Sequence, residues 1–597
     1  MAAKPDAVMT VASQAEVAPR VKPAHLRAFF LISVLTILLT SAPASAQQAL
    51  PRIDPTGRSG DRRPDLLEEE LPPSPPAFRL PPPTLPMGEG QEPFLGRVFV
   101  RKIFVTGSSV FTPEELSKIT APYENRSLTS EDLESLRRAL TLRYVDAGYI
   151  NSGATLPDQE VRDGVITFQI VEGVLTQISV EGNEWFRESY IRDRVELGAG
   201  PPVNVNPLQQ RLQLLQQDNR LRALHAELRP GAKPGEAVLN VKVEEKNPFY
   251  AWFAFNNYQS PSVGAERGLL TLGHQNLSGH GDILSLTYGR SEGLNPQIDA
   301  WYLLPVTVYD TTLLLRYRRN DYAVIDEIFD PLDTRSESDI YEITLRHPLV
   351  RTLHHEFALS LTGESLQDKT FLLGEPFSFY PGVDNGESKV TALRFSQEWT
   401  YRTQSEVVAA RSRFSFGIDA LDATTHSSHS VPDGKFLAWL GQFQWARAFK
   451  TLDTQLLFRT DAQISNQPLL PLEQIAVGGR YTVRGYRENL LVRDQALIAS
   501  LELRIPLVQN TAWAEYLQIV PFSDYGYAKN RDLPSLDPRS IYSVGLGLRW
   551  GVPLMKFPVQ LKLDFEFYWG YALKEVSVPD YNIQDDGIHF QIAVIGF

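Results

Sequence analysis

Arg484 is the side chain whose surroundings are most informative about this chain. It lies in the stretch GGRYTVRGYREN (residues 478–489), where Gly485 allows backbone angles that a β-branched residue cannot adopt. The neighbouring segments alternate like amphipathic β-strands, so this arginine needs either water or a carboxylate partner. Asp524, about forty residues further on, is the candidate carboxylate. An arginine and a carboxylate can make two parallel hydrogen bonds, which fixes their geometry better than lysine would.

This pair supports two hypotheses. In the first, it is a latch that activity requires, and in the second it only holds a loop in its folded position. A buried ion pair is by itself weak evidence for either. The candidate residues of this site, which we call the loop latch, are Val483, Arg484, Gly485, Tyr486, Phe522, Asp524 and Gly526.

Enzymatic and metal-binding chemistry have little support in the sequence. The chain has no cysteine, which excludes disulfides, cysteine-ligated zinc and thiol catalysis. Its close histidine pairs, His354 with His355 and His426 with His429, lack an acidic partner at a metal-site spacing. No nucleophile elbow, Walker loop or dinucleotide-binding fingerprint occurs. The net charge of −13 argues against a nucleic-acid partner. We therefore predict no enzyme, no metal or other cofactor, and no nucleotide or nucleic-acid partner.

Residues 1–46 have the pattern of an export signal peptide. Basic residues precede an apolar run at 28–40, and Ala44-Ser45-Ala46 supplies the small residues that a signal peptidase needs. The alternative is a membrane anchor, but a spanning helix needs about 20 apolar residues, and this run is shorter. Residues 47–96 are proline-rich and predict an extended linker. Within it, residues 65–71 are a candidate for a short helix.

Residues 97–173 and 174–246 predict two α/β units that repeat one plan. Each unit reads as a strand, two helices and two further strands, and a tandem repeat of this size indicates two copies of one supersecondary unit. The predicted elements of the first unit are a strand at 98–106, helices from 112 and at 130–146, and strands at 152–156 and 165–171. Those of the second unit are a strand at 175–180, helices at 187–196 and 207–218, and strands at 223–229 and 237–244.

Residues 247–597 alternate between apolar and polar side chains with the period of β-strands. A soluble sandwich has the same period. The export signal and about sixteen segments that are long enough to cross a membrane favour a closed barrel instead. We expect about eleven of these strands before the Arg484 loop and about five after it. The predicted fold class is a transmembrane β-barrel of about 16 antiparallel strands, preceded by two α+β units.

With these motifs in view, the chain resembles the transporters of two-partner secretion, the TpsB family, from about residue 97 to residue 597. This family joins periplasmic POTRA domains to a sixteen-stranded outer-membrane barrel. The matching residues of the first unit are Gly148, Tyr149, Ser152, Leu156, Pro157, Gln159, Gly164, Glu172 and Gly173. Those of the second unit are Gly182, Asn183, Leu212, Leu214, Leu215, Pro230, Gly231 and Gly235. The start of the barrel matches at Asn257, Tyr258, Asn276, Gly279, Gly281 and Asp282, and the loop-latch residues follow.

The resemblance implies that the α/β units are POTRA domains, the second of them ShlB-type, in the periplasm of a Gram-negative-type bacterium. It implies that the loop around residues 475–496 folds back into the barrel lumen, and that a helix plugs the pore. In this chain the candidate plug at 65–71 is short and lies among prolines, which departs from the family pattern.

The implied function is to bind an unfolded, large TpsA-like exoprotein and to translocate it to the cell surface. The other implied partners are outer-membrane lipid and, during biogenesis, the barrel assembly machinery. The candidate client-binding residues are Tyr149, Leu156, Pro157, Gln159, Asn183, Leu214 and Leu215. The alternative function is that of an outer-membrane assembly or insertion factor of the same superfamily, whose members carry more POTRA domains than the two predicted here.

Overall fold

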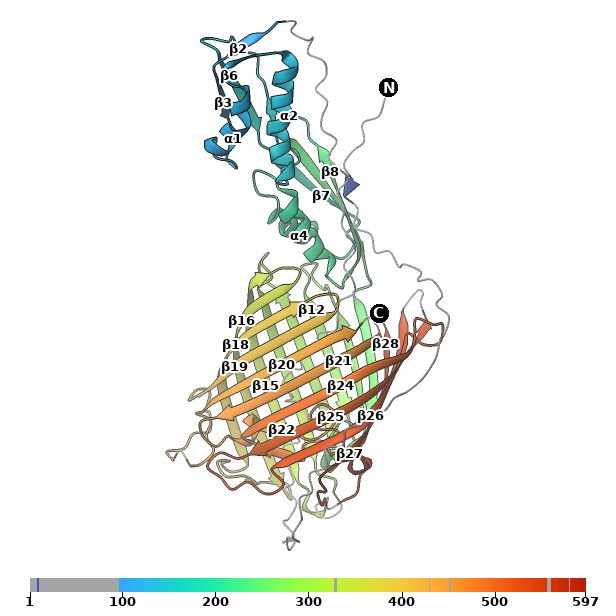
Figure 1. Cartoon of the computed structure of the whole chain (residues 1–597). Coiled ribbons are helices and arrows are strands. Elements are labelled where there is room, and N and C mark those ends of the chain that lie inside the picture. The colour runs from blue at the N-terminus through green and yellow to red at the C-terminus, as the bar shows by residue number, and fades with distance from the viewer. Residues whose placement is uncertain are drawn as a thin grey trace, which may run out of the picture.

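The computed structural model describes residues 96–326, 330–428, 430–449, 453–555, 560–578 and 580–596, together with the two-residue strand β1 (Val8–Met9). Two α/β units stand at one end of a large barrel (Figure 1). Apart from β1, the predicted signal peptide, linker and plug helix lie outside the described residues. None of the helices in the described part of the chain is long and apolar enough to span a membrane.

The first α/β unit follows the predicted order closely. Its helices are α1 (Pro113–Thr120) and α2 (Ser130–Asp146), and each begins with a complete capping box, at Thr112 and at Thr129. Its strands are β2 (Val98–Val100), β3 (Lys102–Thr106), β4 (Arg126–Leu128), β5 (Gly153–Thr155) and β6 (Val165–Val171). The strand predicted at 98–106 is interrupted at Arg101, because β2 pairs with β4 while β3 pairs in parallel with β6. The backbone N–H of Arg101 donates to the carbonyl of Gly164 at this break.

Glu172 holds the loop that precedes α1. Its carboxylate accepts hydrogen bonds from the backbone N–H groups of Ser109 (2.7 Å) and Val110 (3.1 Å) and from the hydroxyl of Tyr144 (3.2 Å). Burial opposes ionisation of this carboxyl, but these hydrogen bonds outweigh it and lower the pKa of Glu172. The residue therefore connects the end of β6 to both helices of the first unit.

The second unit repeats the topology of the first. Its helices are α3 (Glu188–Glu196) and α4 (Val205–Gln216), and its strands are β7 (Val174–Glu181), β8 (Leu221–Pro230) and β9 (Glu236–Glu245). The first strand is parallel to the last and the last two are antiparallel, as in the first unit. Apolar faces of both helices and of the sheet form one core, which includes Leu208, Leu212, Leu224, Leu239 and Val243.

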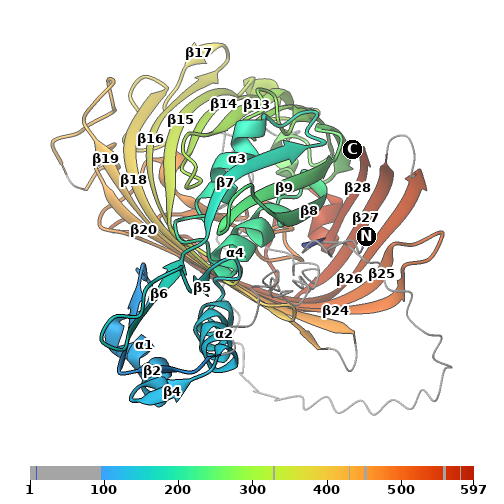
Figure 2. The ribbon, with the colours of Figure 1, turned by 90° about the horizontal axis from the view of Figure 1, so that it is seen from above.

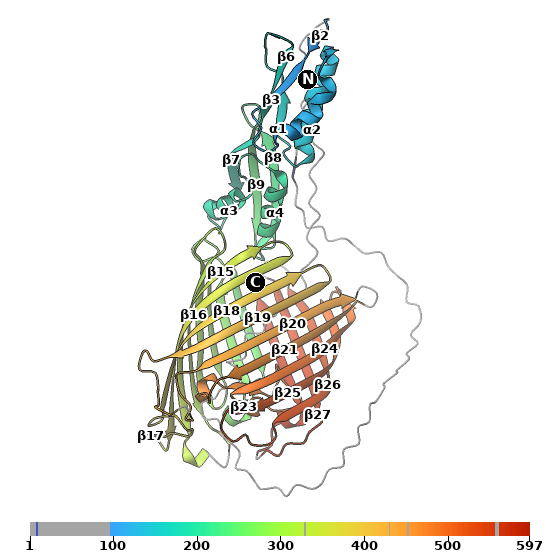
Figure 3. The same cartoon turned by 60° about the vertical axis from the view of Figure 1, so that its left-hand side comes forward.

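Hydrogen bonds to backbone carbonyl groups join the two units to each other. The N–H of Val205 donates to the carbonyl of Gly148 (3.0 Å), and the side chain of Asn204 donates to the carbonyl of Ala147 (3.0 Å). A side chain at Gly148 would collide with Asn204, since an added Cβ would lie 2.6 Å from its oxygen. The units are therefore stacked end to end, as Figure 3 shows.

Two arginines attach the second unit to the turns at the near end of the barrel. Arg194 of α3 pairs with Asp310 (3.1 Å) in the turn after β13, and Arg220 donates to the carbonyls of Gln275 (3.3 Å) and Gly281 in the turn after β11. Seen from above, the second unit lies over the mouth of the barrel and the first unit lies beyond its rim (Figure 2). A molecule that enters the barrel from this end must pass beside the second unit.

The barrel is a closed sheet whose wall is formed by sixteen antiparallel strands, with one short extra strand, β17 (Glu375–Pro376). The strands before the Arg484 loop are β10 (Phe249–Asn256), β11 (Arg267–His274), β12 (Ile283–Arg290), β13 (Leu294–Pro305), β14 (Thr312–Ala323), β15 (Arg335–Arg351), β16 (His355–Leu372), β18 (Glu387–Arg402), β19 (Glu406–Ile418), β20 (Leu437–Phe449) and β21 (Thr454–Ser465). The strands after it are β24 (Gln495–Gln509), β25 (Tyr516–Lys529), β26 (Ser540–Met555), β27 (Leu561–Ala572) and β28 (Ile588–Gly596). The predicted fold class is confirmed, and the expected eleven and five strands are observed.

The alternation along the strands places apolar side chains on the outer face and polar side chains on the inner face, as in a membrane barrel. In β24, Leu497 and Leu501 on the outer face are 44% and 45% exposed, whereas Glu502 on the inner face is 1% exposed. A soluble sandwich would bury the leucines and expose the glutamate. The outer face is thus an apolar surface suited to lipid, and the lumen is polar.

The barrel closes where β10 meets β28. Six residue pairs form this ladder, including Ala254 with Ala593. Asn257 extends it, because its side chain donates to the carbonyl of Ile588 (2.9 Å) and accepts from the N–H of Phe590 (2.8 Å). The seam between the first and last strands is therefore fastened by side-chain as well as main-chain hydrogen bonds.

Candidate functional site in the barrel lumen

The long connection between β21 and β24 folds back into the lumen. It contains the 3-10 turn η4 (Pro471–Glu473) and a hairpin made of β22 (Ile475–Val477) and β23 (Leu491–Arg493). The tip of this hairpin, residues 478–490, lies against the inner wall formed by β24 to β27. The inner wall and the hairpin share an apolar cluster that includes Val477, Val483, Ile498, Ala528 and Ile541.

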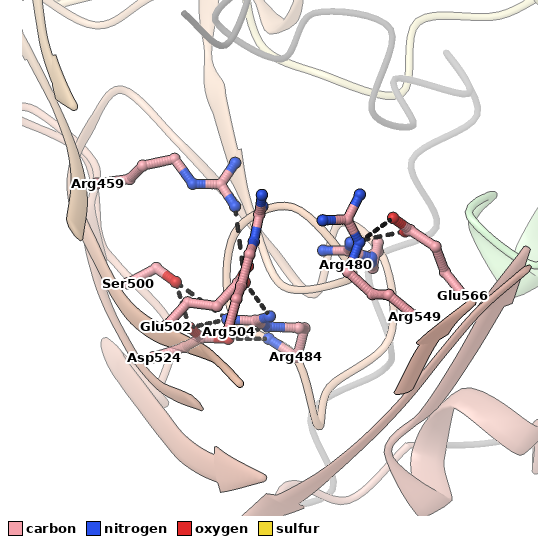
Figure 4. A network of polar contacts seen from close by, with 9 residues as sticks. All are labelled: Arg459, Arg480, Arg484, Ser500, Glu502, Arg504, Asp524, Arg549 and Glu566. Carbon is pink, nitrogen blue, oxygen red and sulfur yellow. Dashed lines mark hydrogen bonds and ion pairs between the residues drawn. The ribbon is translucent and has the colours of Figure 1, made fainter. Parts of the chain in front are cut away.

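Arg484 at the tip contacts two carboxylates. Its Nε and one terminal nitrogen donate to the two oxygens of Asp524 at 2.7 and 2.8 Å, and its backbone N–H donates to the same carboxylate at 3.0 Å. Its other terminal nitrogen donates to Glu502 at 2.8 Å. Ser500 completes the arrangement, since its hydroxyl accepts from Arg484 (3.0 Å) and donates to Asp524 (2.6 Å). Figure 4 shows this network.

The guanidinium is sealed from water on its remaining faces. Its central carbon lies 3.6 Å from the centre of the Phe522 ring, a cation–π contact. Arg484 is 2% exposed and Asp524 is also 2% exposed. A charge in such a place is stable only while its partners remain, so removal of one partner is strongly unfavourable.

Glycines on the wall make room for the tip. An added Cβ at Gly570 would lie 2.6 Å from the backbone nitrogen of Gly485, and one at Gly526 would lie 2.8 Å from a methyl group of Val483. Gly485 itself has φ +94, a left-handed angle that favours glycine. All seven predicted loop-latch residues therefore meet at one place, and the glycines among them are needed for close backbone approach.

Gly485→Ala is expected to loosen the tip. The new Cβ would lie 3.0 Å from the carbonyl oxygen of Gly570 and would occupy a strained backbone angle, which costs on the order of 1–2 kcal/mol. Amide hydrogen exchange in residues 480–488 should become roughly tenfold faster. Gly268→Ala in β11 is the matched control, because an added Cβ there meets no described heavy atom within 4 Å. Equal exchange in the two variants would contradict the close-packing explanation.

Several residues of this site were not predicted from the sequence. Glu502 is one, and it also pairs with Arg504 at 2.9 Å. A second part of the network joins Arg480 of the tip to Glu566 at 2.8 Å, and Glu566 to Arg549 at 3.0 Å. Arg459 also pairs with Glu502, at 3.9 Å, so that five arginines and three carboxylates meet on this side of the lumen (Figure 4). Glu502, Arg504, Arg549 and Glu566 are polar positions of alternating strands, which predicts that they face the lumen but not that they meet the loop.

The rest of the tip is connected to the far end of the barrel. The hydroxyl of Tyr486 makes hydrogen bonds with the carbonyls of Tyr542 and Lys574, both at 3.0 Å. The guanidinium of Arg487 donates two hydrogen bonds to the carboxylate of Asp585, at 2.9 and 2.6 Å. These contacts bind the tip to β26 and to the segment that follows β27, so the loop is held at several points.

Glu473 at the base of the connection contacts β18, three strands away from β21 in the barrel. Its carboxylate accepts from both terminal nitrogens of Arg394 in β18, at 3.1 and 2.9 Å. Arg394 also pairs with Glu364 of β16, and both Arg394 and Glu473 are buried. This contact fastens the base of the connection to the wall independently of Arg484.

The predicted client-binding residues are dispersed over the two α/β units. Leu215 is buried in the core of the second unit, and Tyr149 and Leu156 pack against the core of the first. The side chain of Gln159 makes two hydrogen bonds with the backbone of Thr167, both at 2.8 Å, and Asn183 donates to the carbonyl of Phe186. Pro157 is exposed, and Leu214 is half-buried on α4. The structure does not gather these residues into one surface.

In the part of the chain that the structure describes, no cluster of side chains is suited to metal binding or to catalysis. No group of three or more His, Asp or Glu residues that could hold a metal ion occurs there. His354 makes a hydrogen bond with the carbonyl of Arg402, and the ring of His426 with the carbonyl of Gly382. Charged hydrogen bonds are what the lumen site offers chemically, and they fasten the loop to the wall.

Comparisons with known proteins agree with this architecture. The family described as haemolysin secretion/activation protein ShlB/FhaC/HecB matches residues 235–550, and the ShlB-type POTRA domain matches residues 98–173. The outer membrane transporter CdiB of Escherichia coli is 26% identical over 480 residues, which cover 78% of each chain. CdiB of Dickeya dadantii (strain 3937) is 23% identical over 404 residues, 65% of this chain and 69% of that one.

Solved structures share the fold. CdiB from Escherichia coli superposes with a TM-score of 0.62 at 22% identity, covering 86% of this chain and 92% of that chain. CdiB from Acinetobacter baumannii gives a TM-score of 0.56 at 17% identity, covering 85% and 91%. The family consists of outer-membrane transporters rather than enzymes, with the barrel in the outer membrane and the POTRA domains in the periplasm. Since the family match covers more than half of its length, this chain belongs to the ShlB/FhaC/HecB family of TpsB-type outer-membrane transporters.

Proposed function

We propose that this chain binds one large, unfolded exoprotein through its two POTRA units, the first at 97–173 and the second at 174–246. The exoprotein then passes through the lumen to the cell surface. The proposal is carried mainly by the loop latch, in which a buried, multiply bonded Arg484 holds a folded-back loop inside the pore. A loop that lies in the lumen must move if it obstructs the path of a polypeptide. Charged hydrogen bonds suit that task, because they fix one geometry and can re-form in water.

The POTRA sheets offer a surface for an extended client. The outer edge of β8 pairs with β1, in the register Val8 with Glu227 and Met9 with Ala226. β1 belongs to the predicted signal peptide, so this edge would be free after cleavage. A free edge can accept an extended segment by main-chain hydrogen bonds, with little demand on sequence.

The lumen supports passage of an unfolded chain. On the wall opposite the tip, β14 to β19 line a polar cavity of about 290 Å³ with arginine and glutamate side chains. Many of these charges pair with each other, as Arg346 does with Glu398 at 2.8 Å. A lining rich in charged side chains keeps a passing polypeptide hydrated. No nucleotide is needed, and folding of the client outside would favour outward movement.

Deletion of residues 98–244 is expected to abolish client binding and to leave the pore conductance in lipid bilayers. The deletion removes both POTRA units and keeps every strand that forms the barrel wall. Binding would be measured with the N-terminal part of the client, and heat-dependent migration on gels would confirm that the barrel has folded. Client binding at wild-type affinity by the deleted chain would contradict POTRA docking.

A further inference from the structure

Three aromatic rings from two domains meet at the POTRA end of the barrel. Trp185 lies in the loop between β7 and α3 of the second unit, Phe249 begins β10 and His274 ends β11. The ring centres of Trp185 lie 5.8 Å from Phe249 and 5.6 Å from His274, and those of Phe249 and His274 lie 4.5 Å apart. All three contacts are edge-to-face, the geometry that aromatic pairs prefer.

These rings lie on the outer face of the barrel wall. Along β10, Ala254 and Asn256 face the lumen, whereas Phe253 and Phe255 are exposed on the outside, in phase with Phe249. His274 is the cross-strand partner of Phe249, and Leu284 is the next residue in the same row. The row continues into the apolar outer surface formed by Phe253, Phe255, Leu270, Leu272, Leu284 and Leu286, each at least 40% exposed.

The backbone around Trp185 is held firmly. The carboxylate of Glu245 accepts from the N–H groups of Glu184 (3.1 Å), Trp185 (2.9 Å) and Phe186 (3.1 Å). The N–H of Arg187 donates to the carbonyl of Gly279 in a barrel turn, at 2.9 Å. The loop is thus fixed both to its own domain and to the barrel, and the position of the indole is set by the fold.

Trp185 nevertheless remains 41% exposed and Phe249 remains 56% exposed. Exposed aromatic side chains at the edge of an apolar transmembrane surface are typical of the membrane–water interface, where tryptophan is enriched. We propose that the 184–186 loop of the second POTRA unit is a membrane-contacting element. In this arrangement Trp185 lies at the headgroup level of the periplasmic leaflet, and lipid helps to fix the second POTRA unit over the barrel mouth.

Depth-dependent quenching of tryptophan fluorescence tests this inference in the full chain. The chain would be reconstituted into phosphatidylcholine vesicles whose acyl chains are brominated either near the headgroup or near the chain end. The chain has nine tryptophans, so the Trp185 signal is the difference between wild type and Trp185→Phe. We expect that signal to fall by roughly half with shallow bromine and much less with deep bromine.

Trp252 provides the matched control, because it lies on β10 at a position in phase with the lumen-facing Ala254. The difference between wild type and Trp252→Phe should change little with either lipid. Since the chain has no cysteine, Trp185→Cys labelled with an environment-sensitive dye gives a second, independent measurement of the same position. A Trp185 signal that brominated lipid leaves unchanged, together with a dye spectrum typical of water, would overturn the inference.

Discussion

Arg484→Glu is expected to abolish secretion of the client while the barrel still folds and inserts. The variant would place a third carboxylate beside Asp524 and Glu502, which now contact the arginine at 2.7 and 2.8 Å. Breaking a buried ion pair by removing one partner costs about 3–5 kcal/mol, and repulsion adds to that cost. The ratio of docked to undocked loop would fall by about two to four orders of magnitude. Secreted client per unit of barrel in the outer membrane is the quantity to measure.

Two variants make this result interpretable. Arg531→Glu makes the same charge change at an exposed residue after β25 and should secrete normally. Arg484→Lys keeps the charge but loses the two-bonded contact with Asp524, so we expect partial secretion. Normal secretion by Arg484→Glu would show that the pair only holds the loop in place.

A covalent bond between the loop and the wall is expected to block secretion reversibly. An added Cβ at Gly526 would lie 2.8 Å from a methyl group of Val483, which suits a disulfide between cysteines at these two positions. Because the same Cβ would lie 2.4 Å from Val477, Val477→Ala provides the space. The chain has no other cysteine, so oxidation affects this bond alone. Secretion should stop on oxidation and return on reduction, and Val477→Ala alone should secrete in both conditions.

A disulfide across the seam between β10 and β28 is the matched comparison, and we expect it to leave secretion unaffected. Ala254 and Ala593 are cross-strand partners on β10 and β28, and either type of antiparallel pair places its Cα atoms within disulfide range. Oxidation of Ala254→Cys with Ala593→Cys should leave secretion unchanged, because a client that crosses the lumen does not need the wall to open. Loss of secretion here, with normal secretion by the oxidised loop variant, would favour lateral opening and the assembly-factor alternative.

The strands and the POTRA helices are predictable because local rules decide them. Alternation identifies each strand of the barrel, since one face meets lipid and the other meets water. The capping residues Thr112 and Thr129 mark the helix starts for similar local reasons. Arg484 and Asp524 are also identifiable, because both lie in the motifs by which the chain resembles the TpsB family.

Contacts between distant segments cannot be obtained in this way. Glu502 and Glu566 look like any other lumen-facing carboxylates, and the sequence does not say which of them the loop tip reaches. The bridge from Glu473 to Arg394 depends on how far the base of the loop extends across the lumen. Trp185 is a loop residue of a POTRA unit, and its place on the outside of the barrel follows only from docking of the two domains. The buried position of Leu215 likewise shows that a family-typical residue can belong to the core.

Export of one large protein by this chain would be seen directly in a comparison of extracellular proteins. Matched cells with and without the chain would be grown, and the proteins of the medium and of the outer membrane quantified together. In cells without the chain, we expect a single very large protein to disappear from the medium while the other outer-membrane barrels keep their abundance. An unchanged medium together with depleted outer-membrane barrels would contradict it, because that is the result expected of an assembly factor.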